Sequence, residues 1–377
     1  MAIRLLAVLR KCAGATVLWP RILSGSLVVF AVLLSGCQTV SYYKQAVQGQ
    51  CEILSKGRPI AEVISDPKTP PELARKLALI LELRAFAERD LNLPAHDHYL
   101  RYADLKRRFV VWNVHATPEF SLEPKTWWYP IVGSLKYRGY FLEGDARRYA
   151  EKLRRKGLDV YVEGVEAYST LGWFDDPVLN TFIHHEPPDL AEIIFHELAH
   201  QRLFARGDTD FNEAFATAAA QEGVRRWLHA EGDLAAQENY LTGLRRNADF
   251  VRLVMTGRRR LEGLYRTEPS RPGRSRACLE LHHAFSEQKQ RVIDQMRREY
   301  EQLRIQWGSY RGFDRWFAQP LNNAQLNTVA TYYELVPAFE QLLRANGGDL
   351  ETFYRKVRAL DGLSKEERRQ ALRSVAN

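Results

Sequence analysis

Cysteine is scarce in this sequence, with four residues in 377. Cys12 and Cys37 belong to an apolar N-terminal segment, so the rest of the chain keeps Cys51 and Cys278. The spacing of these two matches no disulfide framework and no cysteine-rich metal motif. In an oxidising compartment they could pair with each other, or each could be a separate buried thiol. The sequence therefore excludes a fold held together by many disulfides and leaves these two alternatives open.

The chain also lacks a strong excess of charge. Its net charge is +8, and four of the excess positive charges lie in residues 1–36, which leaves +4 for the remainder. Three short basic runs, at 106–108, 258–260 and 271–276, have no aromatic residues interleaved with them. Such runs are typical of solvated faces or of contacts with anionic lipid. We therefore expect no nucleic-acid partner.

The N-terminus has the features of an export signal. Basic residues precede a nearly uninterrupted apolar run at 22–34, which ends in Leu34-Ser35-Gly36-Cys37. About 13 apolar residues are fewer than the roughly 20 that span a bilayer, although further apolar length at 5–18 keeps an uncleaved transmembrane anchor open as an alternative. The residues before Cys37 resemble the bacterial lipobox. That resemblance implies a signal peptide at 1–36, acylation of Cys37 and, because Gln38 follows, a lipid-anchored protein of the outer membrane facing the periplasm.

Beyond the signal, residues 37–377 read as one body of four sections. Residues 37–101 have helical spacing of apolar positions, with Pro71 at a helix start. Residues 102–182 show strand patterns at 109–114, 119–122, 127–132, 137–142 and 159–163, and a helix capped by Asp145. A helix pair follows at 183–230, and residues 231–377 are helical, with a less charged stretch at 322–332 that could return to a cleft. We expect an α+β fold, mostly helical, whose small mixed or antiparallel sheet packs against the helix pair.

The helix pair carries the most specific motif of the chain, the sequence His196-Glu197-Leu198-Ala199-His200. Residues i and i+4 lie on one face of a helix, so both imidazoles can reach one cation, and a carboxylate stands beside them. Asp189 is placed as N-cap, with Glu192 completing a capping box, and Gly207 after Arg206 marks the end of the helix. The expected ion is zinc.

A catalytic zinc ion normally has three protein ligands and a water, so a third ligand is needed. If the first helix ends near Arg206, His200 lies about 9 Å back along it, and Glu213 lies about 4.5 Å into a second, antiparallel helix that starts near Asp210. Glu222 would lie about 18 Å in, well beyond the histidines. The geometry therefore favours Glu213. An accidental motif, or a metal bound only for structure, is the alternative, but a structural zinc site commonly includes cysteine and none is nearby.

With Asn212-Glu213-Ala214-Phe215-Ala216 following it, the motif resembles the gluzincin metallopeptidases. That resemblance implies a zincin-like pair of helices, one Zn²⁺ ion bound by His196, His200 and Glu213, and Glu197 as the group that polarises the attacking water. The interval of 12 residues between His200 and Glu213 is shorter than in the best-known members, and Thr217 stands where an orienting Asp is usual. More narrowly, Tyr168 to Pro177, His196 to Gln201 and Asp208 to Ala216 resemble a bacterial family of lipoproteins described as predicted aminopeptidases. The amine-binding Gly-x-Met-Glu-Asn segment of better-known gluzincin aminopeptidases is missing.

Further residues are candidates for the cleft. The segment Tyr168 to Pro177 is rich in groups able to bind substrate, or else it is an aromatic loop that plugs the core. A tyrosine should also steady the oxyanion of the reaction, and Tyr168, Tyr332 and Tyr333 are the candidates. His184 and His185 are expected at a turn or cleft rim, and His282 and His283 on the surface, so none of the four is counted as a ligand. The cleft candidates are Ser169, Gly172, Trp173, Asp175, Asp176 and Tyr332.

These observations predict a zinc-dependent peptidase acting on peptide substrates, with aminopeptidase as the leading subclass by resemblance. Glu197 is expected to take a proton from the attacking water and to pass it to the leaving amine. An endopeptidase of the cell envelope is one alternative. A catalytically inactive lipoprotein that binds a peptide or envelope partner is another.

Overall fold

The computed structural model describes residues 37–129, 133–167, 174–267 and 276–376. The predicted signal peptide lies outside these residues, and the side chains of Cys37 and Cys278 are not described, so lipidation at Cys37 stays a prediction. Cys51 is a free, exposed thiol. Within the described ranges, every helix is too short or too polar to cross a membrane.

The N-terminal section is helical, as the sequence predicted. It comprises α3 (Cys37–Lys56), α4 (Ile60–Ser65) and α5 (Pro71–Leu91). Proline at the first position of α5 leaves no helical hydrogen bond unmade, because the first N–H groups of a helix have no partner within it. Asn92, with φ +54°, ends α5 in the left-handed conformation.

A small mixed sheet joins this section to the centre of the molecule. Its strands are β1 (Gly57–Pro59), β2 (Arg101–Ala103) and β8 (Val178–Leu179), in the order β1-β2-β8. The first pair is antiparallel and the second is parallel. Strands of two or three residues are too short to show an alternating pattern, which is why the sequence did not reveal them.

The larger sheet has a central strand, β3 (Val111–Pro118), flanked by β6 (Tyr137–Tyr140) and β7 (Leu158–Val165), both antiparallel to it. A separate hairpin pairs β4 (Trp127–Tyr129) with β5 (Gly133–Leu135). The helix α6 (Glu143–Arg154) starts after Leu142, so Asp145 lies in its first turn and is not the N-cap that the sequence predicted.

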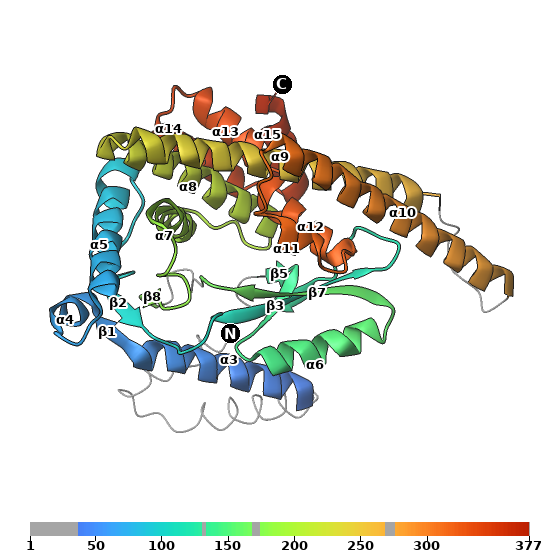
Figure 1. Cartoon of the computed structure of the whole chain (residues 1–377), viewed down its shortest axis with the longest axis horizontal. Helices are drawn as coiled ribbons and strands as arrows, with labels where there is room; N and C mark the ends of the chain where they lie inside the picture. Colours follow the sequence, from blue (N-terminus) through green and yellow to red (C-terminus); the bar gives the residue numbers. More distant parts are fainter. Residues whose placement is uncertain (1–36, 130–132, 168–173, 268–275, 377) are drawn as a thin grey trace, which may run out of the picture.

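The two faces of the larger sheet differ in polarity, because side chains of a strand point alternately to opposite faces. Val114, Ala116 and Val160 point toward α6 and form a core with Ala146 and Ala150. The opposite face is polar, and it is covered by α12 (Asn323–Tyr333), as Figure 1 shows. Its residues include Asn113, His115, Thr117, Asp159, Tyr161 and Glu163.

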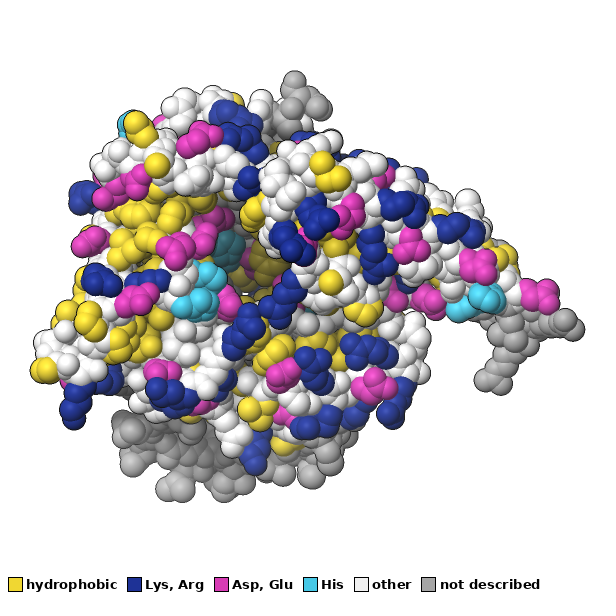
Figure 2. Space-filling view, viewed as in Figure 1, with side chains coloured by type: hydrophobic (Ala, Val, Ile, Leu, Met, Phe, Trp, Pro, Cys, Tyr) yellow, Lys and Arg dark blue, Asp and Glu magenta, His cyan; other side chains and the backbone are white. Residues whose placement is uncertain are grey.

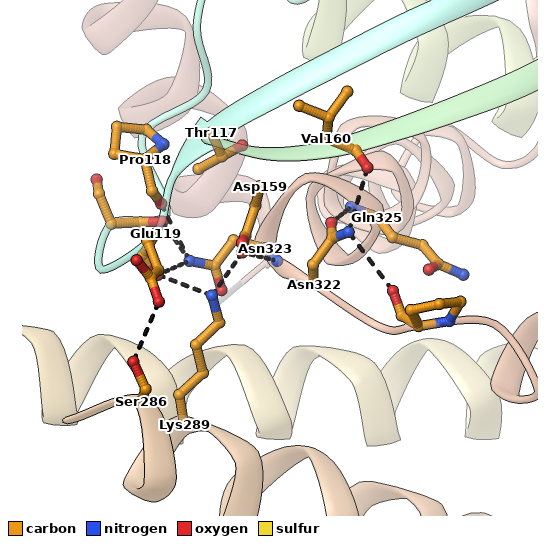
Figure 3. Close-up of polar contacts among 12 residues, drawn as sticks. Thr117, Pro118, Glu119, Asp159, Val160, Ser286, Lys289, Asn322, Asn323 and Gln325 are labelled. Atoms are coloured by element: carbon orange, nitrogen blue, oxygen red, sulfur yellow. Dashed lines mark hydrogen bonds and ion pairs between the residues drawn. The ribbon is translucent and has the colours of Figure 1, made fainter. Parts of the chain in front are cut away.

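One predicted strand, at 119–122, is wrong, and the reason lies in its hydrogen bonds. The side-chain amide of Asn323 donates to the carbonyl oxygens of Pro118, Glu119 and Ser121, at 3.2, 2.8 and 2.9 Å. Lys289 binds the same segment through the carbonyl of Glu119 (Figure 3). These carbonyl groups therefore accept hydrogen bonds from α12 and from α10 (Arg276–Gln306) instead of from a neighbouring strand.

The C-terminal section is helical, as predicted. The long helices α9 (Leu234–Tyr265) and α10 (Arg276–Gln306) pack against each other, and Figure 1 shows them lying across one side of the molecule. Shorter helices follow, namely α11 (Asp314–Phe317), α12, α13 (Val336–Arg344), α14 (Leu350–Asp361) and α15 (Lys365–Ala376).

The predicted helix pair is α7 (Pro187–Arg202) and α8 (Thr209–Glu231), which pack against each other in the main core. The predicted ends of α7 need correction. Its N-cap is Glu186, so Asp189 lies in the first turn, and the helix ends at Arg202, four residues before Arg206, where Leu203 becomes extended. The expected fold class, α+β and mostly helical with small sheets, is confirmed.

Candidate active site

The helix α7 presents the two histidines of the motif from a rigid support. Leu190, Ile194, Phe195 and Leu198 are completely buried, so one side of the helix is fixed in the main core. His196 and His200, one turn apart, then lie on a shared face. Their ring centroids are 4.9 Å apart.

Glu213 comes from α8, and its position depends on the turn between the two helices. The side chain of Asn212 accepts a hydrogen bond from the amide of Ala205 (2.7 Å) and donates one to the carbonyl of the same residue (2.8 Å). This pair of hydrogen bonds fixes the start of α8 against the end of α7. Glu213 therefore faces the two imidazoles.

The three side chains converge on one point. The distance between the Nε2 atoms of His196 and His200 is 3.2 Å, and Oε2 of Glu213 lies 3.3 Å from the first and 3.7 Å from the second. Ligand atoms about 2.0–2.1 Å from a tetrahedral ion are about 3.3 Å apart. Two imidazole nitrogens and one carboxylate oxygen at this spacing fit a divalent zinc ion with a position left for water.

Buried ion pairs hold the first turn of α8 in place. Asp210, which is 2% exposed, contacts Lys136 and Arg369 at 2.6 Å each. Asp208 pairs with Arg368 at 3.0 Å. Burial opposes ionisation of Asp210, but the nearby lysines and arginine outweigh it and keep the pKa of this carboxyl below its usual value. The C-terminal helix α15 thus fastens the helix that carries Glu213.

The two carboxyl groups of the site have opposite pKa shifts. Burial raises the pKa of Glu197 to about 7; Glu213 and Asp176 act in the same direction, and His196 opposes them. Burial would also raise the pKa of Glu213, but hydrogen bonds and charges of His196 and His200 lower it to about 2. Glu213 is thus an anion suited to bind a cation, and Glu197 is a carboxyl group able to gain and lose a proton near neutral pH.

Glu192 is not part of a capping box, because α7 starts two residues before Asp189. Its side chain is partly buried instead, and it accepts a hydrogen bond from the Tyr240 hydroxyl at 2.9 Å. It also lies within electrostatic reach of His196, one turn further along the helix.

The Nδ1 atom of His200 is buried with no hydrogen-bond partner among the described residues.

The three candidate tyrosines differ in their position relative to the site. Tyr332, near the end of α12, faces the site, since the charge of Glu213 is the largest cause that raises its pKa well above the usual value. Tyr333 faces another way: burial and Glu192 raise its pKa to about 12, and its hydroxyl bonds the side chain of Asn247. Tyr168 lies outside the described residues.

The segment expected to line the cleft is described only at its end. Ser169, Gly172 and Trp173 lie outside the described residues, and Asp175 is exposed. Asp176 is 3% exposed and lies close enough to Glu197 to raise its pKa. Tyr99 lies next to Asp176, and no sequence pattern pointed to it.

A second group of two histidines and a glutamate lies at the start of α7. His184 and His185 occupy a turn, as predicted, but their ring nitrogens approach the carboxylate of Glu166. Nε2 of His185 is 2.6 Å from Oε2 of Glu166. His282 and His283 are surface residues, with side chains 44% and 77% exposed.

Figure 2 shows histidine and acidic side chains gathered in a hollow of the molecular surface, with hydrophobic side chains along one wall and Lys and Arg side chains along another. A hollow lined by titratable groups of this kind is typical of a catalytic site.

A family model described as "Putative aminopeptidase" matches residues 41–372 of the chain. The match covers all four sections of the folded body, including α7, α8 and α12. No curated protein matches the chain, and no solved structure does.

Proposed function

Since the chain belongs to this putative aminopeptidase family, we propose that it is a zinc-dependent peptidase with His196, His200 and Glu213 as the metal ligands. The observation that carries the proposal is the spacing of the three ligand atoms, 3.2 to 3.7 Å, which suits one tetrahedral ion. The ligand set is that of catalytic zinc sites that keep a position open.

When bound, zinc lowers the pKa of a coordinated water to about 7 and polarises a carbonyl group. Glu197 serves as general base and then as general acid, because its carboxyl group stands beside the two histidine ligands on the same helix. It accepts a proton from the attacking water and delivers it to the nitrogen of the leaving amine. The gluzincin resemblance of the motif supports the same assignment.

Tyr332 is the group that we assign to the developing oxyanion. A tyrosine hydroxyl is protonated at neutral pH, so it can donate a hydrogen bond to a negatively charged oxygen. It reaches the site from α12, whose first turn is fixed by Asn322 and Asn323 through contacts with β7 and the residues after β3.

The experiment compares hydrolysis of free and N-acetylated peptides by the wild type, Glu197→Gln and Glu186→Gln, with zinc content measured for each. We expect Glu197→Gln to retain zinc and to lower kcat by about 10²- to 10⁴-fold. Glu186 is exposed at the N-cap of the same helix and makes no capping hydrogen bond, so Glu186→Gln is the matched control and should resemble the wild type.

Substrate preference separates the subclasses. Cleavage restricted to free amino termini supports an aminopeptidase, and equal cleavage of blocked peptides supports an envelope endopeptidase. Zinc binding without turnover of any peptide would remove the enzymatic proposal and favour a peptide-binding lipoprotein.

A further inference from the structure

Tyr99, in the segment between α5 and β2, has an unusual backbone conformation. Its φ of +60° lies in the left-handed region, although it carries a large aromatic side chain. In this region the Cβ atom of an L-residue crowds the following carbonyl oxygen, so bulky residues rarely occupy it. Such a conformation persists where the surrounding structure imposes it, and it is concentrated at functional sites.

Specific hydrogen bonds impose this conformation. The amide of Tyr99 donates to the carbonyl of Asp176 at 2.8 Å, and the amide of Asp176 donates to Nδ1 of His98 at 3.1 Å. Arg84 donates from Nε to the carbonyl of His98 at 3.0 Å. The strained residue is thus held between α5 and the segment that leads into β8.

The hydroxyl group of Tyr99 has no partner among the recorded hydrogen bonds of the described residues, although the residue is only 3% exposed. A buried tyrosine hydroxyl normally has one. The side chain lies in the field of the active site: burial, followed by the charges of Glu197 and Asp176, raises its pKa well above the usual value. The side chain therefore lies near Glu197 and Asp176, and a tyrosine hydroxyl is a hydrogen-bond donor at neutral pH.

We propose that the Tyr99 hydroxyl donates a hydrogen bond to a backbone carbonyl oxygen of the bound peptide, on the Glu197 side of the site. This inference rests on the proposed peptidase function. Carbonyl oxygens are the acceptors that every peptide offers, whatever its side chains. Glu213 acts more strongly than Glu197 on Tyr332, which is assigned to the oxyanion, so the two tyrosines bind different oxygen atoms of the peptide. The strained backbone is what directs Tyr99 into this position.

The test is Tyr99→Phe, which keeps the ring and removes only the hydroxyl. Loss of one neutral hydrogen bond to substrate should lower kcat/KM by about 2- to 12-fold. Zinc content and the midpoint of thermal unfolding should not change. The matched control is Tyr102→Phe, because Tyr102 is also buried, three residues further on in β2, and its raised pKa, about 12, comes from burial and Asp104. Equal kcat/KM for Tyr99→Phe and the control would overturn the proposal and leave the peptidase function standing.

Peptide binding to the Glu197→Gln protein, measured by calorimetry, distinguishes the two proposals further. The comparison is between Glu197→Gln and the double variant that also carries Tyr99→Phe. Weaker peptide binding by the double variant supports the role of Tyr99, even if the wild type hydrolyses no peptide. Equal binding argues against it. If Tyr99→Phe does not fold, a crystal structure of Glu197→Gln with bound peptide decides: the Tyr99 hydroxyl either lies within hydrogen-bond distance of a peptide oxygen or it does not.

Discussion

The same set of three residues, two histidines and a glutamate, occurs twice among the described residues, and the two groups differ in their spacing. In the group of His196, His200 and Glu213, the ligand atoms are 3.2 to 3.7 Å apart, as around a shared ion. In the group of Glu166, His184 and His185, the shortest contact is 2.6 Å, which is the length of a charge-assisted hydrogen bond. The first spacing suits a shared metal ion, as we propose, and the second suits a shared proton.

The scaffold explains the difference. Residues four apart on a helix point the same way, so His196 and His200 direct their nitrogens toward one point. His184 and His185 are adjacent in a turn, and their rings are stacked with centroids 4.4 Å apart. The planes of these two rings are inclined by 29°, and a metal ion lies close to the plane of each imidazole that binds it. The ring planes of His196 and His200 are inclined by 84°, so their geometry suits a shared ion better.

The charges around the second group also disfavour metal binding. The hydrogen bond to Glu166 raises the pKa of His185, with burial opposing it. A histidine that holds its proton firmly competes poorly as a metal ligand, since ligation needs the neutral ring. Lys76 adds a positive charge next to both residues through hydrogen bonds to their carbonyl oxygens, at 2.8 and 2.7 Å. Residue composition alone therefore does not identify a metal site.

The largest predicted effect comes from removing one histidine of each group. We expect His200→Ala to weaken zinc affinity by more than about 100-fold, since even partners of ligands matter by about 10- to 100-fold. His185→Ala should leave the protein with one zinc ion per chain. Metal analysis after dialysis measures both. A wild type that retains two ions, one of them lost in His185→Ala, would contradict the comparison.

A smaller effect, on stability, is predicted for the ion pairs that hold α8, the helix that carries Glu213. Asp210→Asn leaves Lys136 and Arg369 partly buried without their shared carboxylate, so the free energy of unfolding should fall by about 3 kcal/mol. Urea denaturation measures it. Asp145→Asn is the control, because Asp145 also lies in the first turn of a helix but pairs with the largely exposed Arg148; a change within about 0.5 kcal/mol is expected. Similar losses of unfolding free energy in both variants would show that the ion pairs of α8 stabilise the fold no more than an exposed pair does.

The smallest effect concerns the second group and depends on pH. The pKa of His185 is raised above 6.5 in the folded protein, so its contribution to stability is complete below pH 6.5 and disappears as the pH rises through the raised value. The pKa of Glu166 is lowered below 4.5, chiefly by its hydrogen bond to His185, so its contribution is present above pH 4.5 and disappears as the pH falls through the lowered value. The pair should therefore stabilise the fold most between pH 4.5 and 6.5.

Because both side chains are partly exposed, the gain is at most about 1 kcal/mol. The measurement is the difference in unfolding free energy between the wild type and Glu166→Gln from pH 5 to pH 8. The difference should shrink as the pH rises. A difference that stays constant over this range would mean that the two groups do not form a titrating pair.

Much of the helical framework could be predicted from the sequence. Proline at the start of α5, the apolar spacing of α9 and α10, and the motif on α7 all act over a few residues. The ends of elements were less predictable: α7 starts at Pro187 and ends at Arg202, because proline is tolerated in a first helical turn and because the chain turns extended at Leu203. The predicted strand at 119–122 failed because Asn323, some 200 residues away, takes its carbonyl groups.

By itself the sequence determined that two imidazoles and a carboxylate stand on one helix and that a second helix could bring Glu213 to them, since helical periodicity places residues a few positions apart. Only the tertiary structure decided that Tyr99 lies near Glu197, that Tyr332 and not Tyr333 lies near Glu213, and that His185 is hydrogen-bonded to Glu166. These arrangements join segments far apart in the chain, and they depend on buried hydrogen bonds and charges whose partners no local pattern reveals.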